Sequence, residues 1–248
     1  MTGLYDDTGA PVPVPARVDR VVSLVPSLSE AVAVSAPGLL VGATDWCSQP
    51  PGLQVARVRG TKNPDVTAVL GLKPDLVLAN AEENRSQDLD ALREAGLAVW
   101  TTYPRTLPEA LASLARALQA CGLDRPGWLD DADAAWREPW TGERRRAVVP
   151  VWRRPWMAVG SGTFTGDVLA RLGVDNVLAD HPERYPRVDL MQLPEHDLVV
   201  LPDEPYLFTP QDGPECFTAP SRCVSGRHLT WYGPSLVEAR VLLEQQLA

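Results

Sequence analysis

The pattern of apolar and polar positions predicts strands that alternate with helices through the first hundred residues. Residues 21–25 form a continuous, largely β-branched run, which is typical of a strand buried on both faces of a parallel sheet. The run ends at Pro26, and residues 27–30 have the Ser-x-x-Glu form of a capping box that opens a helix. Further strands are predicted at residues 39–43, 76–79 and 97–101, and further helices at residues 63–71 and 86–95.

The pattern changes after residue 104. Thr106 can cap a helix there, and Gly122 closes it. Four leucines at the spacing i, i+4, i+7 and i+11 give this helix one apolar stripe: Leu107, Leu111, Leu114 and Leu118. A weaker helical piece at residues 128–136 and an arginine-rich stretch at residues 139–146 follow. Alternation then resumes, with strands at residues 147–152, 156–159 and 198–201 and helices at residues 164–172 and 235–247.

The sequence therefore predicts an α/β fold with two lobes. Strands that alternate with helices form parallel sheets, so we expect an N-terminal α/β lobe at residues 1–104 and a C-terminal α/β lobe at residues 141–248. A connecting helical segment at residues 105–140 joins them. In open parallel sheets ligands bind beyond the carboxyl ends of the strands, so the loops that follow the strands are where functional side chains are expected.

Composition excludes several classes of protein. With 45% apolar and 22% charged residues the chain has the composition of a globular protein with a sizeable core. No apolar run approaches the roughly 18 residues of a membrane span, so no membrane insertion is expected. The net charge of −9 argues against a nucleic-acid partner. Lys62 and Lys73 are the only lysines among 23 basic residues.

The N-terminus and the cysteines indicate the compartment. Residues 1–7 lack the basic and apolar regions of an export signal, so we expect a cytoplasmic protein, or an extracytoplasmic one if a leader has been removed. Only two of the four cysteines, Cys216 and Cys223, are near one another in sequence. Four free thiols are the main interpretation, and a disulfide between Cys216 and Cys223 is the alternative.

Signatures of the common enzyme classes are missing from the sequence, including GxSxG, HExxH and the Walker A loop. His181, His196 and His228 lack the spacing of metal ligands, so we expect separate surface histidines and no metal site. A glycine-rich loop at residues 160–166 runs into a predicted helix. A tight strand-to-helix turn is its main interpretation, and an anion site at its backbone amides is the alternative.

Aromatic residues gather at predicted strand ends and loops, not on amphipathic helix faces. They are Trp46, Trp100, Trp152, Trp156, Tyr185, Tyr206, Trp231 and Tyr232. Together they predict a cleft between the lobes that holds a large, flat or amphipathic molecule. Acidic residues lie at two strand ends, Glu82 and Glu83 in the first half and Asp203 and Glu204 in the second, although a solvated helix start explains the first pair equally well.

Short motifs in a fixed order resemble those of the class III substrate-binding proteins, the helical-backbone metal receptors. In the first half they are DTGAPV from Asp7, RVVSLVPSLSE from Arg20, GTKNPD from Gly60, LKPDLV from Leu72 and EENR from Glu82. In the second half they are WRRPWMAVG from Trp152, LPDEPY from Leu201 and LTWYG from Leu229. The resemblance implies two α/β lobes joined by one long helix, with a ligand cleft between them. Such proteins serve ABC importers of vitamin B12, haem and iron–siderophores.

The resemblance to the B12-binding members also implies a set of ligand contacts. They fall on Trp46, Lys62, Asn80, Arg85, Trp152, Trp156, Tyr185 and Trp231. A corrin or chelate ring offers wide apolar faces to indoles and polar edges to Lys62 and Asn80. Cobalamin, haem or a ferric chelate would be the ligand, and no further cofactor is required.

Two positions depart from the family pattern. Importer-docking members present one glutamate on each lobe to arginines of the permease, and the matching positions here are Thr67 and Met191. We therefore expect a cytoplasmic monomer that binds a small molecule without docking an ABC permease. Two alternatives stay open: an exported importer receptor, or an enzyme that acts on a hydrophobic metabolite by cyclisation, elimination or hydrolysis. The acid/base candidates of that enzyme are Glu83, Asp203 and Glu204.

Overall fold

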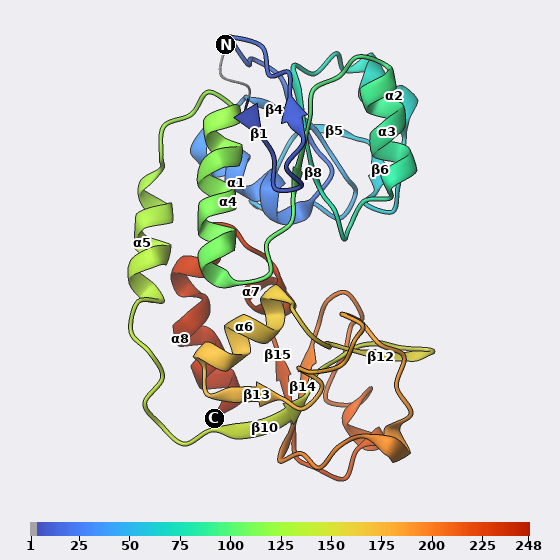
Figure 1. Ribbon diagram of the computed structural model, residues 1–248, viewed down its shortest axis with the longest axis vertical. Coiled ribbons are helices and arrows are strands. Elements are labelled where there is room, and N and C mark those ends of the chain that lie inside the picture. The colour runs from blue at the N-terminus through green and yellow to red at the C-terminus, as the bar shows by residue number, and fades with distance from the viewer. Residues whose placement is uncertain (1–3) are drawn as a thin grey trace. The chain divides into compact units, whose positions relative to one another are not determined.

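The computed structural model of the protein describes residues 4–248 and divides into two compact units (Figure 1). Residues 1–3, part of the segment expected to carry no export signal, lie outside the described residues. None of the helices within residues 4–248 has the length and apolar character of a membrane span. Unit 1 comprises Met1–Pro104, Ala110–Asp130 and Tyr232–Pro234, and unit 2 comprises Arg105–Glu109, Asp131–Trp231 and Ser235–Ala248. The predicted connecting segment, residues 105–140, is thus shared between the units.

Unit 1 is built on a five-stranded parallel sheet of order β5-β4-β3-β8-β9. Its strands are β3 (Val21–Ser23), β4 (Leu40–Ala43), β5 (Ala56–Arg57), β8 (Leu76–Asn80) and β9 (Val99–Thr102). Strands β3, β8 and β9 are buried throughout, which explains their continuous apolar runs. The helices are α1 (Pro26–Ser35), α2 (Val66–Gly71) and α3 (Ser86–Glu94), and two small antiparallel pairs join β1 (Leu4–Tyr5) to β2 (Pro11–Val12) and β6 (Arg59–Gly60) to β7 (Asn63–Pro64).

Helices α2 and α3 lie on one flank of this sheet and α1 lies on the other (Figure 1). The cluster under α2 and α3 joins side chains of the sheet, Val22, Val77 and Val99, to Val69 of α2 and Leu92 of α3. Each of these side chains is at most 3% exposed. Strands β3, β8 and β9 are therefore covered on both faces, as the sequence pattern predicts.

The predicted capping box at the start of α1 is wrong. The helix begins at Pro26, and its N-cap is Val25, which has an extended backbone and makes no side-chain cap. Proline is favoured at the first helical position because its missing N–H would have no partner there. Ser27 and Glu30 are consequently buried inside the helix and do not cap it.

Unit 2 is built on a four-stranded parallel sheet of order β13-β10-β14-β15. Its strands are β10 (Arg145–Val148), β13 (Val174–Asn176), β14 (Leu198–Pro202) and β15 (Ser221–Val224). An antiparallel hairpin joins β11 (Pro150–Arg153) to β12 (Trp156–Ala158). The helices are α6 (Phe164–Arg171), α7 (Gly226–Thr230) and α8 (Leu236–Leu247), with short 3-10 turns at Leu190–Gln192 and Pro214–Cys216.

The prediction of one strand at residues 147–152 is wrong. The apolar run divides at Val149 into β10 and β11, which belong to different sheets. Strands β13 and β15 were not predicted, because each is short and carries polar residues such as Asn176 and Arg222. Their place in the sheet comes from pairing with β10 and β14 and not from their own apolar pattern.

The helix predicted from the leucine stripe is α4 (Leu107–Ala120), and α5 (Gly127–Ala135) follows it. All four leucines of the stripe are buried. The predicted cap is confirmed, since Thr106 Oγ1 accepts the backbone N–H of Glu109 at 3.3 Å.

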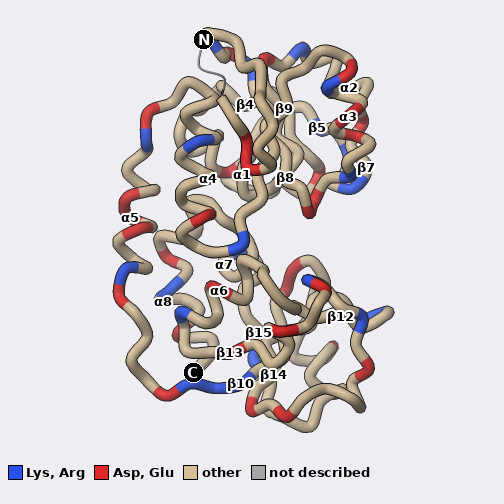
Figure 2. The backbone as a smooth tube through the Cα atoms, in the orientation of Figure 1, with Lys and Arg blue, Asp and Glu red and all other residues tan. Residues whose placement is uncertain are grey.

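Basic and acidic residues alternate along both units, and residues 144–146 are the longest basic run in the described part of the chain (Figure 2).

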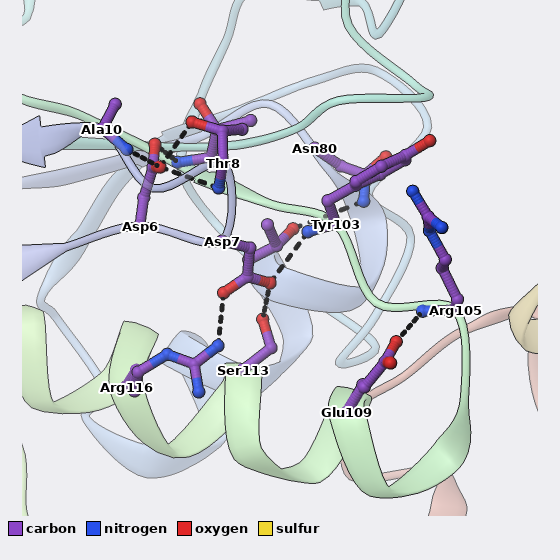
Figure 3. Close-up of polar contacts among 12 residues, drawn as sticks. Asp6, Asp7, Thr8, Ala10, Asn80, Tyr103, Arg105, Glu109, Ser113 and Arg116 are labelled. Atoms are coloured by element: carbon purple, nitrogen blue, oxygen red, sulfur yellow. Dashed lines mark hydrogen bonds and ion pairs between the residues drawn. The ribbon is translucent and has the colours of Figure 1, made fainter.

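A buried aspartate ties the N-terminal hairpin to the rest of unit 1 (Figure 3). Asp7 Oδ2 accepts from the backbone N–H of Tyr103 at 2.8 Å and from Ser113 Oγ at 2.6 Å, while its Oδ1 pairs with Arg116 at 2.6 Å. The Asp7 side chain is 7% exposed. Three donors therefore compensate a carboxylate that has lost most of its water.

We expect Asp7→Ala to lower the free energy of unfolding by about 2–4 kcal/mol, because it strips three donors of their acceptor. Urea unfolding followed by circular dichroism measures the change. The matched control is Asp90→Ala, which breaks an exposed pair with Arg93 and is expected to cost less than about 0.5 kcal/mol. Equal effects of the two substitutions would contradict the assignment of Asp7 as an anchor.

Candidate functional site

Both sheets are parallel, so each unit has one edge at which the carboxyl ends of its strands and the loops after them gather. In unit 1 these loops follow β4, β5, β8 and β9, and we call them the strand-end face of unit 1. In unit 2 they follow β13, β14 and β15, and together with the β11–β12 hairpin we call them the strand-end face of unit 2. The eight predicted ligand contacts lie on these two faces, which Trp231 reaches through its hydrogen bond to Glu204.

Asn80, the last residue of β8, organises the strand-end face of unit 1. It is 3% exposed. Its Oδ1 accepts the backbone N–H groups of Glu82 at 2.8 Å and Glu83 at 3.1 Å, and its Nδ2 donates to the Tyr232 hydroxyl at 2.7 Å. The structure thus gives Asn80 a positioning role, and its direct contact with a ligand stays a prediction.

Tyr232 is the partner that completes this network. Its hydroxyl also lies 2.8 Å from Thr102 Oγ1 at the end of β9. Burial raises the pKa of the Tyr232 phenol far above its usual value, so the group stays neutral. The next residue, Gly233, packs so closely that a Cβ there would lie 3.1 Å from the carbonyl oxygen of Ser27. The segment Tyr232–Pro234 is therefore an integral part of unit 1.

The loop after β8 carries a second buried amide. Asn84 Nδ2 donates to the carbonyl oxygens of Leu24 at 3.2 Å and Thr61 at 2.9 Å, which joins three loops of the face. Lys62, at the tip of the β6–β7 hairpin, donates to the carbonyl oxygen of Glu82. Two predicted contacts, Lys62 and Asn80, are thus brought together through the Glu82 backbone.

The other two predicted contacts of unit 1 lie apart from this network. Trp46 is 69% exposed, and its Nε1 would lie 3.3 Å from a Cβ built on Gly60, so the indole covers the β6–β7 hairpin. Arg85 pairs with Asp88 at 2.9 Å across the first turn of α3. Arg85 therefore has its ion-pair partner within α3, whereas Trp46 leaves apolar surface exposed.

Five aromatic side chains of unit 2 form one contiguous group, the aromatic cluster: Trp152, Trp156, Tyr206, Phe208 and Phe217. Trp152 and Tyr206 meet edge to face at 5.7 Å, and Tyr206 contacts Phe208 at 4.6 Å. Trp156 stacks on Phe208 at 6.0 Å. Phe208 is buried and Trp152 is 42% exposed, so the cluster runs from the core to the surface.

Charged groups fix the hairpin that carries the two tryptophans. Arg153 lies 5.6 Å from the Trp156 ring and pairs with both Asp212 and Glu215. Tyr206 donates its hydroxyl to Asp212 Oδ2 at 2.7 Å. A hydrogen bond from the Gly213 backbone, reinforced by Arg153, lowers the pKa of Glu215 to about 2. The cation beside the aromatic cluster is therefore neutralised by two carboxylates.

The half-buried Glu204 and the buried Trp231 form a hydrogen-bonded pair beyond β14. Trp231 Nε1 donates to Glu204 Oε2 at 2.8 Å, and Trp231 is 8% exposed. Burial raises the pKa of Glu204, and the Trp231 hydrogen bond offsets part of that rise. Asp203 Oδ1 accepts the backbone N–H of Gly226 at 2.6 Å, and a Cβ at Gly226 would lie 2.6 Å from the Glu204 nitrogen. Only glycine allows this close approach of α7 to the strand end.

The glycine-rich loop is a strand-to-helix turn. Thr163 Oγ1 accepts the backbone N–H of Gly166 at 3.1 Å and so caps α6. Gly160 lies against the loop that carries Tyr185, since a Cβ at Gly160 would lie 2.1 Å from the Glu183 carbonyl oxygen. The half-buried Tyr185 is thereby held beside the β12 end of unit 2.

One expectation about the histidines is wrong. His228 is buried, with Nδ1 2.7 Å from Ser225 Oγ and Nε2 2.9 Å from Glu238 Oε1, so it links α7 to α8. Ser225 and Glu238 satisfy both ring nitrogens, which is why an isolated histidine is tolerated inside the unit. All four cysteines are unpaired in the structure. Within residues 4–248 no three His, Cys, Asp or Glu side chains are grouped as a metal site requires.

Two features of the site were missed from sequence. Phe208 and Phe217 pack against Trp156, and these contacts could be found only through the pairing of distant loops. Asn84 fixes the loop after β8 through its side-chain hydrogen bonds. Its position two residues after Glu82 gave no sign that it would be buried. The tyrosine at 206 was recognised as a strand-end aromatic but was not assigned to the ligand site.

The comparisons with known proteins agree with this architecture. No protein-family profile matches the chain. The vitamin B12-binding protein of Vibrio cholerae serotype O1 is 26% identical over 191 residues, which cover 72% of this chain and 68% of the relative. That of Salmonella typhi is 27% identical over 197 residues, covering 70% and 68%. The chain is thus similar to class III periplasmic substrate-binding proteins.

Solved structures of such binding proteins share the fold of this chain. The periplasmic vitamin B12-binding protein BtuF of Vibrio cholerae superposes with a TM-score of 0.74 at 19% identity, covering 94% of this chain and 98% of that one. The periplasmic haem-binding protein BhuT in complex with two haems superposes with a TM-score of 0.70 at 19% identity, covering 92% and 97%. The predicted fold of two α/β lobes with parallel sheets is confirmed. The predicted ligand cleft between the lobes stays a prediction.

The raised pKa of Glu204 makes a testable contribution to stability. Because its folded-state pKa lies above the ordinary value of 4.5, its ionisation opposes folding at pH values above the folded pKa, and this cost disappears as the pH falls to about 4.5. We expect the stability of the wild type, relative to that of Glu204→Gln, to rise as the pH is lowered from 7 to 4.5. Urea unfolding at several pH values measures the difference.

The matched control for this experiment is Glu195→Gln, the same substitution at a side chain that is 91% exposed. Its stability difference from the wild type should vary by less than about 0.5 kcal/mol over the same range. A pH-independent difference for Glu204→Gln would show that burial does not perturb this carboxyl.

Proposed function

We propose that this chain is a binding protein for a flat metal chelate of the tetrapyrrole or corrin type, and that it performs no reaction on its ligand. The observation that carries the proposal is the aromatic cluster of unit 2, which exposes Trp152 at the strand-end face. The curated relatives that support it are vitamin B12-binding proteins, and a haem-binding protein shares the fold.

The aromatic cluster is suited to a wide apolar ring because it is formed before the ligand arrives. Trp152 is held by Tyr206, and Tyr206 is held by its contact with Phe208 and its hydrogen bond to Asp212. A side chain that is already ordered loses little conformational entropy on binding. The exposed indole face of Trp152 can then contribute its apolar area almost in full.

Unit 1 supplies polar groups of the kind that orient a ligand. The Asn80 network fixes the backbone of the loop after β8, and the exposed Lys62 is attached to that loop through the Glu82 carbonyl. A few fixed polar groups beside apolar surface are typical of small-molecule sites. Lys62 and the Glu82–Glu83 backbone are the polar groups that the strand-end face of unit 1 offers to a ligand.

We also propose that the protein does not dock an ABC permease through paired charges. Thr67 on α2 is exposed, and Met191 is 91% exposed. Neither side chain can pair with an arginine, so the contact that steers and orients such docking is lacking at both positions. The four unpaired thiols support a reducing compartment, and we propose a cytoplasmic location.

An enzyme remains the second candidate because of one observation. Glu204, one of its three acid/base candidates, combines partial burial with a raised pKa, as a general acid requires. Asp203 is exposed, and its Oδ1 accepts the backbone N–H of Gly226. Recovery of the ligand unchanged after prolonged incubation supports binding alone. Conversion of the ligand that is lost in Glu204→Gln would establish the enzyme instead.

Titration with cyanocobalamin, ferric haem or a ferric siderophore is expected to quench the tryptophan fluorescence. We expect Trp152→Ala to weaken the affinity for the quenching ligand about tenfold, because it removes one face of the ring contact. The control is Trp128→Phe in unit 1, where the indole donates to Ser35 and the affinity should change less than twofold. No response to any of the three ligands would overturn the proposal.

Docking is tested with a vitamin B12 permease reconstituted in nanodiscs. We expect no measurable binding by this chain, since Thr67 and Met191 offer no charge to the permease. The Vibrio cholerae vitamin B12-binding protein serves as the positive control. An affinity for the permease within tenfold of that control would contradict the proposal.

A further inference from the structure

The orientation of the Glu204 carboxylate is fixed, and half of its accepting capacity is unused. Oε2 accepts from Trp231 Nε1, whereas Oε1 accepts no hydrogen bond from the residues that the structure describes. The backbone on which it stands is also fixed, because Asp203 N–H donates to the Val224 carbonyl oxygen at 3.1 Å and Asp203 Oδ1 accepts from Gly226. Glu204 therefore presents one acceptor in a set direction.

This carboxylate lies beside the aromatic cluster along the chain. Only Pro205 separates it from Tyr206, the ring that meets Trp152 edge to face. A flat ring lying on Trp152 and Tyr206 would bring part of its rim toward the strand end that carries Glu204. The substituents on that rim would then meet either an acceptor or a negative charge.

The charges around Glu204 leave this part of unit 2 negative. Arg227 lies close enough to stabilise the ionised form of Glu204, but it also pairs with Glu238 at 3.4 Å. Asp203 adds a second negative charge that opposes ionisation of Glu204. Arg153 is neutralised by Asp212 and Glu215. The exposed cation of the β11–β12 hairpin, Arg154, stands at the turn and not at the strand end.

We infer that Glu204 is a specificity-determining residue that favours a ring rimmed with carboxamides over one rimmed with carboxylates. A carboxamide N–H can donate to Oε1 of Glu204, while a carboxylate there would meet like charge and lose its water without a partner. This inference rests on the proposed function, because it assigns the rim chemistry of the same ligand. It adds a preference between two ligand classes, because corrin-like ligands carry carboxamides on the rim and haem-like ligands carry carboxylic acids there.

The test measures the affinities of the full chain for matched probes by tryptophan quenching at pH 7.5. The probes are cyanocobalamin, its three monocarboxylic acids, in each of which one rim amide is hydrolysed, and ferric haem. We expect the wild type to bind cyanocobalamin about tenfold more tightly than at least one monocarboxylic acid and than haem. A tenfold ratio corresponds to about 1.4 kcal/mol.

Variants assign the preference to Glu204. Glu204→Gln keeps an acceptor for Trp231 and should reduce the ratio of the affinities to threefold or less. Glu195→Gln removes the same charge from an exposed position and should leave the ratio unchanged. The wild-type ratio is informative even if Glu204→Gln does not fold, because equal affinities for cyanocobalamin and all three acids overturn the inference.

The possible failures are distinguishable. If none of the probes, including ferric haem, quenches the fluorescence, the proposed function fails and the inference fails with it. If haem binds more tightly than cyanocobalamin, or if Glu204→Gln leaves the ratio at the wild-type value, the inference is overturned while the binding function stands.

Discussion

The strand-end face of unit 1 depends on one buried amide, the side chain of Asn80. A carboxamide carries two donors and an acceptor oxygen with two lone pairs, and here these groups serve two loop N–H groups and the Tyr232 hydroxyl. A buried network of this kind orders its surroundings only when its members are satisfied, since an unpaired member costs more than the bond contributes. The loop that holds Lys62 and the edge of β9 therefore share one set of contacts.

Unit 2 reaches a comparable order by different means. Its strand-end face is held by aromatic packing and by ion pairs around Arg153, with Trp231 and Glu204 closing the end of β14. Aromatic rings supply large apolar area with few rotatable bonds, so this face can be both rigid and partly exposed. The strand-end face of unit 1 thus has fixed polar groups, and that of unit 2 has fixed apolar area.

Much of this fold could be predicted from sequence because the central strands are buried on both faces. Burial on both faces leaves a continuous apolar run, as in β3 and β8, and the leucine spacing of α4 is equally direct. Strands β13 and β15 could not be predicted, because short strands with polar residues are defined by their partners. The burial of His228 was missed for the same reason, since its partner Glu238 lies ten residues away on another helix.

The candidate site was predicted less completely than the fold. The number of tryptophans and their positions at predicted strand ends could be read from the sequence, and Trp152 and Trp156 do lie in one cluster. Whether Asn80 faces a ligand or a tyrosine 152 residues away depends on a contact that no local pattern encodes.

The placement of Tyr232 in unit 1 has a consequence for synthesis. A nascent chain that ends before residue 232 lacks the phenol that Asn80 requires, so unit 1 completes its polar core only after residue 232 has left the ribosome.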